Sequence, residues 1–169
     1  MDISSGKYVV GVIFLVILYF FIREIYRDRR LFGLFKRQKT LRDYSKTEIT
    51  TLTESLIIDL CNMYGTNVPK WGYNNLRKDK YMGVYIGQLK TIYFDYDYLY
   101  EEQTYLANWF VLVVHEFTHY FDHITLENEG KDWDKMYLSR KDFYESRADD
   151  NSLKVGEKLY LNYLRDGNI

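Results

Sequence analysis

All three histidines of this chain lie within residues 115–123, and the first two frame the pattern His-Glu-x-x-His as His115, Glu116 and His119. Helical residues four apart lie one turn apart on one face, so a helix here lets both imidazoles reach a single ion. Glu116 is rotated by roughly 100° from His115 and can lie beside such an ion without binding it. The pattern therefore favours a helix that presents two nitrogen ligands and a carboxylate able to accept a proton from metal-bound water.

The residues before this pattern indicate that its helix is buried. Residues 109–114 read Trp-Phe-Val-Leu-Val-Val, almost without polar groups. Buried histidine and glutamate side chains are costly unless they are paired or bound to a metal. This setting favours a zinc site over the alternative that the pattern is a chance feature of an exposed helix.

A catalytic zinc site usually has three protein ligands and one position for water, and two residues compete for the third place. His123 would lie roughly 12 Å from the first histidine along a straight helix, too far to share an ion held at about 2 Å. Glu145 lies near the start of residues 143–164, which we expect to form the last helix, with Ser139 and Asp142 as its capping pattern. A glutamate one turn into that helix could face the histidines, although acids also favour helix starts for electrostatic reasons alone.

Further acidic residues accompany these candidates. Asp149 lies four residues after Glu145 on the same helical face and could accept the remaining N–H of a zinc-bound histidine, which fixes its tautomer. We interpret Asp122 and Asp150 as solvated charges, and His123 as a partly exposed residue near the end of its helix.

HEFTH, followed after a gap by ESRAD, resembles the gluzincin arrangement, in which H-E-x-x-H lies on one helix and E-x-x-A/S-D on the next. The chain is similar to thermolysin-type peptidases and to compact ImmA/IrrE-like domains over roughly residues 80–165. The resemblance implies one zinc ion held by His115, His119 and Glu145, with Glu116 as catalytic base. It also implies that Asp149 accepts a hydrogen bond from a zinc-bound histidine. The chain lacks thermolysin's large domains and has no fourth histidine to stabilise a transition state, a role that a tyrosine or arginine could take.

Residues 80–99 are rich in Tyr, Ile and Val and are interrupted by Gly87-Gln88, which predicts strands over about 80–86 and 89–95 joined by a tight turn. Zincins carry a strand just before the H-E-x-x-H helix, and substrate commonly lies along it as an added strand. The resemblance implies this use for residues 89–95, whose edge would be open to strand addition. A plain hairpin that covers the helices is the alternative.

A capping box, Ser45-Lys-Thr-Glu48, predicts the start of an upstream helix. Its apolar positions are spaced by three and four, as in a helix that packs on a core: Ile49, Leu52, Leu56, Leu60 and Met63. The single cysteine, Cys61, excludes an intramolecular disulfide and is expected to be a buried small hydrophobe. Residues 64–79 have the composition of a long loop.

Residues 8–22 are uncharged and almost entirely apolar, which approaches the length of a short membrane span. No small-residue cleavage site follows, so we expect an uncleaved anchor rather than a cleaved signal peptide or a buried soluble helix. Nine basic and three acidic residues lie in 23–46, which by the positive-inside rule keeps the carboxyl side in the cytoplasm and the N-terminus outside.

The two parts of the chain differ in net charge. The net charge of −1 combines ten basic and four acidic residues in 1–46 with thirteen basic and twenty acidic residues in the remainder. An acidic domain is a poor nucleic-acid binder, and the basic segment is explained by the flank of a membrane span.

We therefore expect a single-pass anchor over residues 1–26, a basic juxtamembrane linker over 27–43 and an α+β zincin-like domain over 44–169. In that domain a small sheet would pack on the H-E-x-x-H helix and on a second ligand-bearing helix. The expected activity is zinc-dependent hydrolysis of peptide bonds in a protein or peptide substrate. The rival is a catalytically inactive, membrane-tethered zincin-fold module for binding or regulation, and a small membrane protein with a coincidental motif is the third interpretation.

Overall fold

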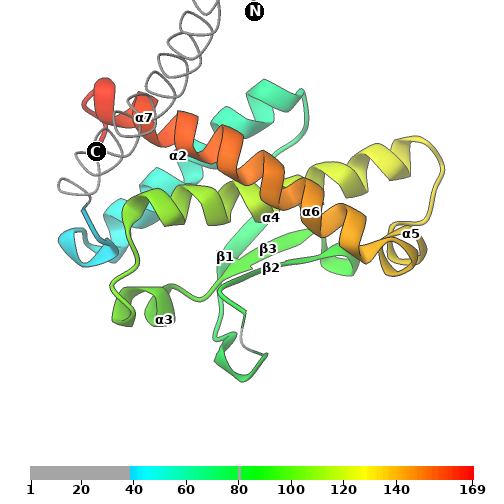
Figure 1. The fold of residues 1–169 in the computed structure, drawn as a ribbon, viewed down its shortest axis with the longest axis horizontal. Helices are drawn as coiled ribbons and strands as arrows, with labels where there is room; N and C mark the ends of the chain where they lie inside the picture. The colour runs from blue at the N-terminus through cyan, green and yellow to red at the C-terminus, as the bar shows by residue number, and fades with distance from the viewer. Residues whose placement is uncertain (1–38, 80) are drawn as a thin grey trace, which may run out of the picture. The chain divides into compact units, whose positions relative to one another are not determined.

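Helix α4 (Leu106–Asn128) lies at the centre of the computed structural model, which describes residues 39–79 and 81–169. The sheet, α2, α6 and α7 all contact it (Figure 1). Its side chains Trp109, Phe110, Val113 and Val114 are fully buried, so the prediction of a buried helix is confirmed. The expected anchor over residues 1–26 and the linker up to residue 38 lie outside the described residues. Within residues 39–79 and 81–169, no helix is long and apolar enough to cross a membrane.

The chain forms an α+β fold, dominated by helices, in a fixed order of elements. The helices and strands are α2 (Lys46–Tyr64), β1 (Lys70–Tyr73), β2 (Gly83–Ile86), β3 (Thr91–Phe94), α3 (Tyr96–Glu101), α4, α5 (Trp133–Ser139), α6 (Lys141–Asn151) and α7 (Glu157–Arg165). Short 3-10 turns are η1 (Leu41–Asp43), η2 (Arg77–Asp79) and η3 (Gly87–Leu89), and a π-helical turn, η4 (Ser152–Gly156), joins α6 to α7.

The mixed sheet has the order β1-β3-β2, with β1 parallel and β2 antiparallel to β3. The two strands expected on either side of Gly87 are confirmed as β2 and β3. Strand β1 lies inside residues 64–79, which we had interpreted as a loop. The expected open edge at residues 89–95 is wrong, because β3 is the central strand, paired on both sides, and the two edges of the sheet are β1 and β2.

Helix α2 begins with the predicted capping box. The Ser45 side chain accepts a hydrogen bond from the Glu48 amide at 3.2 Å, and the Glu48 carboxylate accepts one from the Ser45 amide at 2.7 Å. Gly65 ends the helix with φ 65°, a left-handed conformation that favours glycine. The predicted core positions of α2, Cys61 included, are buried, with the exception of Met63, which is 53% exposed.

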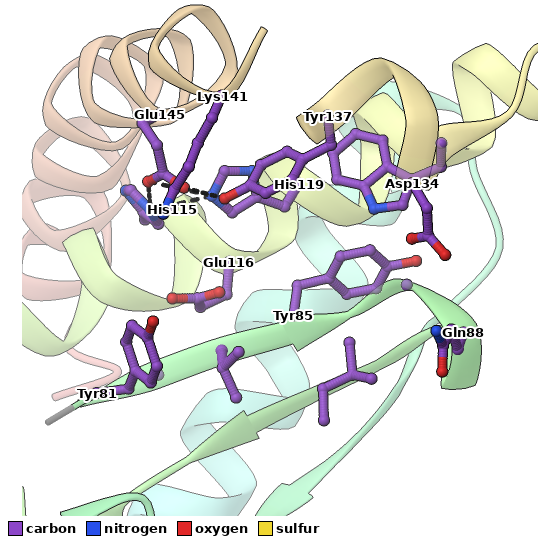
Figure 2. Close-up of a pocket in the computed structure, with 15 residues that line it drawn as sticks. Tyr81, Tyr85, Gln88, His115, Glu116, His119, Asp134, Tyr137, Lys141 and Glu145 are labelled. Atoms are coloured by element: carbon purple, nitrogen blue, oxygen red, sulfur yellow. Dashed lines mark hydrogen bonds and ion pairs between the residues drawn. The ribbon is translucent and has the colours of Figure 1, made fainter. Parts of the chain in front are cut away.

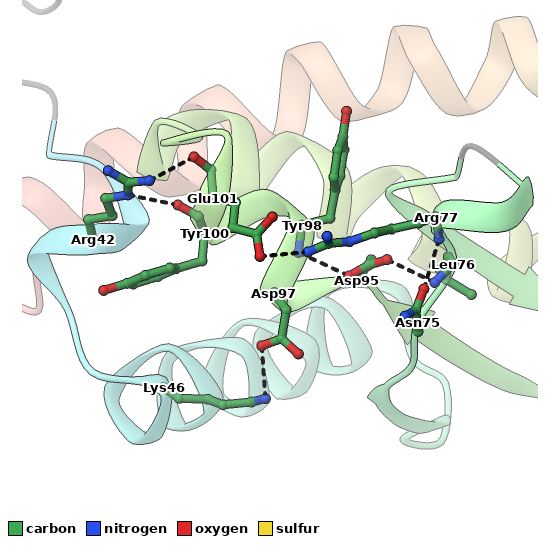
Figure 3. Close-up of polar contacts among 10 residues, drawn as sticks. All are labelled: Arg42, Lys46, Asn75, Leu76, Arg77, Asp95, Asp97, Tyr98, Tyr100 and Glu101. Carbon is green, nitrogen blue, oxygen red and sulfur yellow. Dashed lines mark hydrogen bonds and ion pairs between the residues drawn. The ribbon is translucent and has the colours of Figure 1, made fainter.

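Asp95, which directly follows β3, connects two segments through its carboxylate (Figure 3). One carboxylate oxygen accepts a hydrogen bond from the amide of Tyr98 at 3.0 Å and caps α3, and the other accepts one from the amide of Leu76 at 2.8 Å.

The Arg42 guanidinium donates to the carbonyl oxygens of Tyr100 and Glu101 at 3.0 and 2.8 Å. These contacts hold the residues before α2 against the end of α3.

The last helical stretch runs from α6 through η4 to α7 and lies along α4 (Figure 1). The expected capping pattern of Ser139 and Asp142 is wrong. Helix α5 extends through Ser139, whose hydroxyl donates to the Met136 carbonyl, and α6 follows after Arg140, which makes no side-chain cap. The two helices are therefore separated by a single residue, Arg140, and no longer loop connects them.

Gly156 permits the close approach of this stretch to α4, which generates a testable prediction. A Cβ at Gly156 would lie 2.9 Å from Val111 Cα and 3.2 Å from Val111 N. We expect Gly156→Ala to lower the free energy of unfolding by roughly 1–3 kcal/mol, although alanine is the better helix former. Urea unfolding followed by circular dichroism measures this, and Gly72→Ala, with no atom within 4 Å of the new Cβ, is the control. Equal stability of the two variants would contradict the packing argument.

Candidate metal centre

Three ligand atoms from two helices converge on one point. The Nε2 atoms of His115 and His119, one turn apart on α4, are 3.2 Å apart. Glu145 Oε2, from α6, lies 3.6 Å from the first and 3.7 Å from the second. A tetrahedral ion with bonds of about 2.0–2.1 Å separates its ligand atoms by about 3.3–3.4 Å. The spacing fits, so this group could hold a metal ion, as the sequence predicted.

Both carboxylate oxygens of Glu145 face partners, since Oε1 accepts a hydrogen bond from the hydroxyl of Tyr137 on α5 (Figure 2). The Tyr137 ring also meets the His119 ring edge-on, with centroids 5.7 Å apart. Tyr137 therefore holds the carboxylate of one candidate ligand in place and packs on the imidazole of another. The sequence pointed to no particular residue for such a role, because one tyrosine among eighteen carries no local signal.

Asp149 lies behind the first histidine. Its Oδ1 is 3.1 Å from Nδ1 of His115, so it can accept that N–H and leave Nε2 free to bind an ion. The corresponding Nδ1 of His119 is buried and has no hydrogen-bond partner among the described residues. The two histidines are thus supported differently, one by a carboxylate and the other by packing.

Glu116 points from α4 toward β2 and is 5% exposed. A Cβ on Gly83 would lie 3.0 Å from its Cγ, so a glycine in β2 gives the side chain room. Burial raises the pKa of Glu116 to about 8, the negative charge of Glu145 adds to the rise, and a backbone hydrogen bond from Tyr85 opposes it. A cation at the three ligand atoms would favour the ionised form.

Burial also sets the protonation of His119. It lowers the pKa of this imidazole to about 4, and the charge of protonated His115 adds to the effect, whereas Glu145 and Asp149 oppose it. His119 is therefore neutral at pH 7, which is the form that binds a metal.

The site opens into a cleft between β2 and helices α4, α5 and α6 (Figure 2). Aromatic side chains line much of it: Tyr81, Tyr85, Trp133 and Tyr137. Lys141, one turn before Glu145, extends along the cleft on the same side as the ligand residues.

Three other residues singled out in the sequence lie outside this group. His123 is hydrogen-bonded to the Tyr85 hydroxyl at 2.8 Å through Nδ1 and takes no part in the three-ligand cluster. The expectation that Asp122 is a solvated charge is wrong. The residue is 2% exposed, and its Oδ1 lies 2.9 Å from a guanidinium nitrogen of Arg147. Asp150 is exposed, as expected.

Comparison of the chain with protein-family models, with curated proteins and with solved structures finds no match. The resemblance to gluzincins stays a prediction that rests on the HEFTH and ESRAD motifs.

The buried Glu116 predicts a pH dependence of stability in the metal-free protein. Its pKa is raised on folding, so its contribution is fully favourable below about pH 4.5 and is lost as the pH rises toward 8. We expect Glu116→Gln to remove this loss, with a stabilisation on the order of a few kcal/mol that grows from pH 5 to pH 8. Urea unfolding of both proteins in a chelator across this range measures the difference. Parallel stability curves would contradict a buried, protonated carboxyl group.

The contact between Asp149 and His115 predicts an effect on metal affinity. We expect Asp149→Asn to weaken zinc binding by about 10–100-fold, because the histidine loses the carboxylate that orients it. Competition with a chromophoric chelator measures the affinity. Asp150→Asn removes the same charge from the next residue, which is exposed and not part of the group, and should bind zinc as the wild type does. Equal losses in both variants would show a general charge effect instead.

Proposed function

We propose that this chain is a membrane-anchored zinc metallopeptidase that hydrolyses peptide bonds in protein or peptide substrates. The observation that carries the proposal is the convergence of ligand atoms from His115, His119 and Glu145 at tetrahedral spacing, with Glu116 in the same cleft. Two imidazoles and one carboxylate are a donor set found in catalytic zinc sites, and they leave a fourth position for water or substrate. Bound zinc would supply a Lewis acid that polarises a carbonyl oxygen and lowers the pKa of water.

Glu116 is the proposed general base. Its carboxylate accepts a proton from the attacking water and returns that proton to the nitrogen of the leaving amine. Burial raises the pKa of Glu116, and a cation at the three ligand atoms would lower it again, so the loaded site would favour the carboxylate that accepts the proton. Gly83 leaves space for the carboxyl group beside β2, and the Tyr137 hydroxyl would hold Glu145 at its position by donating to it.

Strand β2 is the proposed docking edge for the substrate backbone. The Asp95 amide donates to the Met82 carbonyl at 2.9 Å, and backbone groups alternate in direction along an antiparallel strand. The backbone N–H and C=O groups of Gly83 and Tyr85 therefore point away from β3 into the cleft, where the Tyr85 amide also donates to Glu116. A peptide added along this edge would pass next to Glu116 and the ligand residues.

The membrane anchor in this proposal is supported by the sequence. Residues 8–22 carry no charge, and the nine basic residues in 23–46 favour a cytoplasmic position for the segment that follows. The domain would then act on substrates at the cytoplasmic face of the membrane.

Replacement of the base separates binding of zinc from turnover. We expect the full-length chain to hold about one zinc by elemental analysis after dialysis, and Glu116→Gln to retain it. The same variant should lose cleavage of a mixed-sequence peptide library by about 100-fold or more, because proton transfer is lost. Glu145→Ala is the contrasting variant, which should lose zinc and activity together.

Two outcomes would contradict the proposal. Full activity of Glu116→Gln would exclude the mechanism. One zinc per chain with no cleavage by the wild type would favour the rival, a tethered module that binds without turnover.

A further inference from the structure

The cleft beside β2 is closed at one end. The turn that follows the strand contacts α5 so tightly that a Cβ on Gly87 would lie 2.6 Å from Cδ1 of Trp133 and 2.8 Å from its Nε1. Both residues line the cleft. An extended chain that runs along β2 past Glu116 therefore meets this contact and cannot continue straight beyond it.

The closing wall is held by aromatic packing. The Trp133 ring is stacked on the His123 ring with centroids 5.4 Å apart and planes at 5°, and on the Tyr137 ring at 5.1 Å. Tyr144 and Tyr85 meet it edge-on. Trp133 is buried, and these contacts on several sides leave it no room to swing aside.

A carboxylate lies at this closed end. Figure 2 shows the side chain of Asp134 directed toward the end of β2, near the Tyr85 hydroxyl and Gln88. Within the described part of the chain, no hydrogen bond or ion pair engages the Asp134 carboxylate. Lys90 and Lys131, which line the adjoining hollow, are paired with Glu127 and Glu129 at 2.7 and 2.5 Å.

The length of β2 sets how far this carboxylate lies from the reacting bond. Gly83 lies against Glu116, and Gly87 lies against Trp133. Four residues of strand span roughly 13 Å, so about three residues of an extended substrate fit between the base and the closed end. The group that meets Asp134 thus belongs to a residue close to the cleaved bond.

We propose that the substrate presents an ammonium group at the closed end of the cleft and that Asp134 binds it. The inference rests on the proposed peptidase activity. An ammonium group has two sources in a polypeptide: a free N-terminus, in which case the enzyme removes short N-terminal segments, or a lysine side chain near an internal site. Asp134 is a specificity-determining residue in either case.

A chemically blocked peptide library distinguishes the sources. One mixed-sequence library without arginine is made in four versions, with N-termini free or acetylated and lysines free or Nε-acetylated. The zinc-loaded full-length chain should cleave the unblocked version at least tenfold faster than the doubly blocked one, as expected for a charge-assisted hydrogen bond. Whichever singly blocked version keeps the fast rate identifies the source of the ammonium group.

Asp134→Asn tests the residue itself. It should slow cleavage of the unblocked library about tenfold and leave the doubly blocked library unaffected. Asp142→Asn is the matched control, since Asp142 also lies in the first turn of a helix but outside the cleft, and it should behave as the wild type.

Two results would overturn the inference while the peptidase activity stands. One is equal cleavage of the unblocked and doubly blocked libraries, and the other is an equal effect of the Asp134 and Asp142 variants. Absence of any Glu116-dependent cleavage in zinc-loaded protein would instead overturn the proposed function, and this inference with it.

Discussion

The close packing of the last helical stretch on α4 is the constraint on which the site depends. Gly156 lies against the Val111 backbone, and farther along the same stretch the Asn151 amide donates to the Thr118 hydroxyl at 2.7 Å. These contacts fix how α6 lies along α4 and bring Glu145 to the imidazoles. The π-helical turn between α6 and α7 ends at Gly156 itself, and its wider winding changes the phase of α6 relative to α7.

Burial then decides the chemistry of the groups that this packing brings together. An exposed cluster of two histidines and two glutamates would hold several charges at pH 7, and water would screen them. In the cleft, His119 is neutral and Glu116 favours its protonated form. The metal-free centre thus favours an uncharged Glu116, and a bound cation would restore the carboxylate that the proposed mechanism requires. Stability of the metal-free domain favours the protonated form of Glu116, whereas the proposed mechanism needs its ionised form.

The sequence predicted those features that are local. The capping box at Ser45, the buried helix around residue 115 and the spacing of the histidines are all encoded within a few residues. The grouping of Glu145 with the two histidines was predicted from the HEFTH and ESRAD motifs. What sequence reasoning missed depends on distant partners: β1 is a strand because it pairs with β3, and α5 is stabilised by the packing of Trp133. Strand order is likewise not local, which is why an open edge was expected at β3, the central strand.

The edge position of strand β2 also affects how the domain can aggregate. An edge strand with unpaired backbone groups is a template on which another copy of the chain can extend the sheet. Here the edge is four residues long, and the bulky wall at Trp133 stands at one end of it. A strand from a second molecule would meet that wall before it gained enough hydrogen bonds to persist. The closed end of the cleft therefore limits how far a second copy of the chain could extend the sheet at this edge.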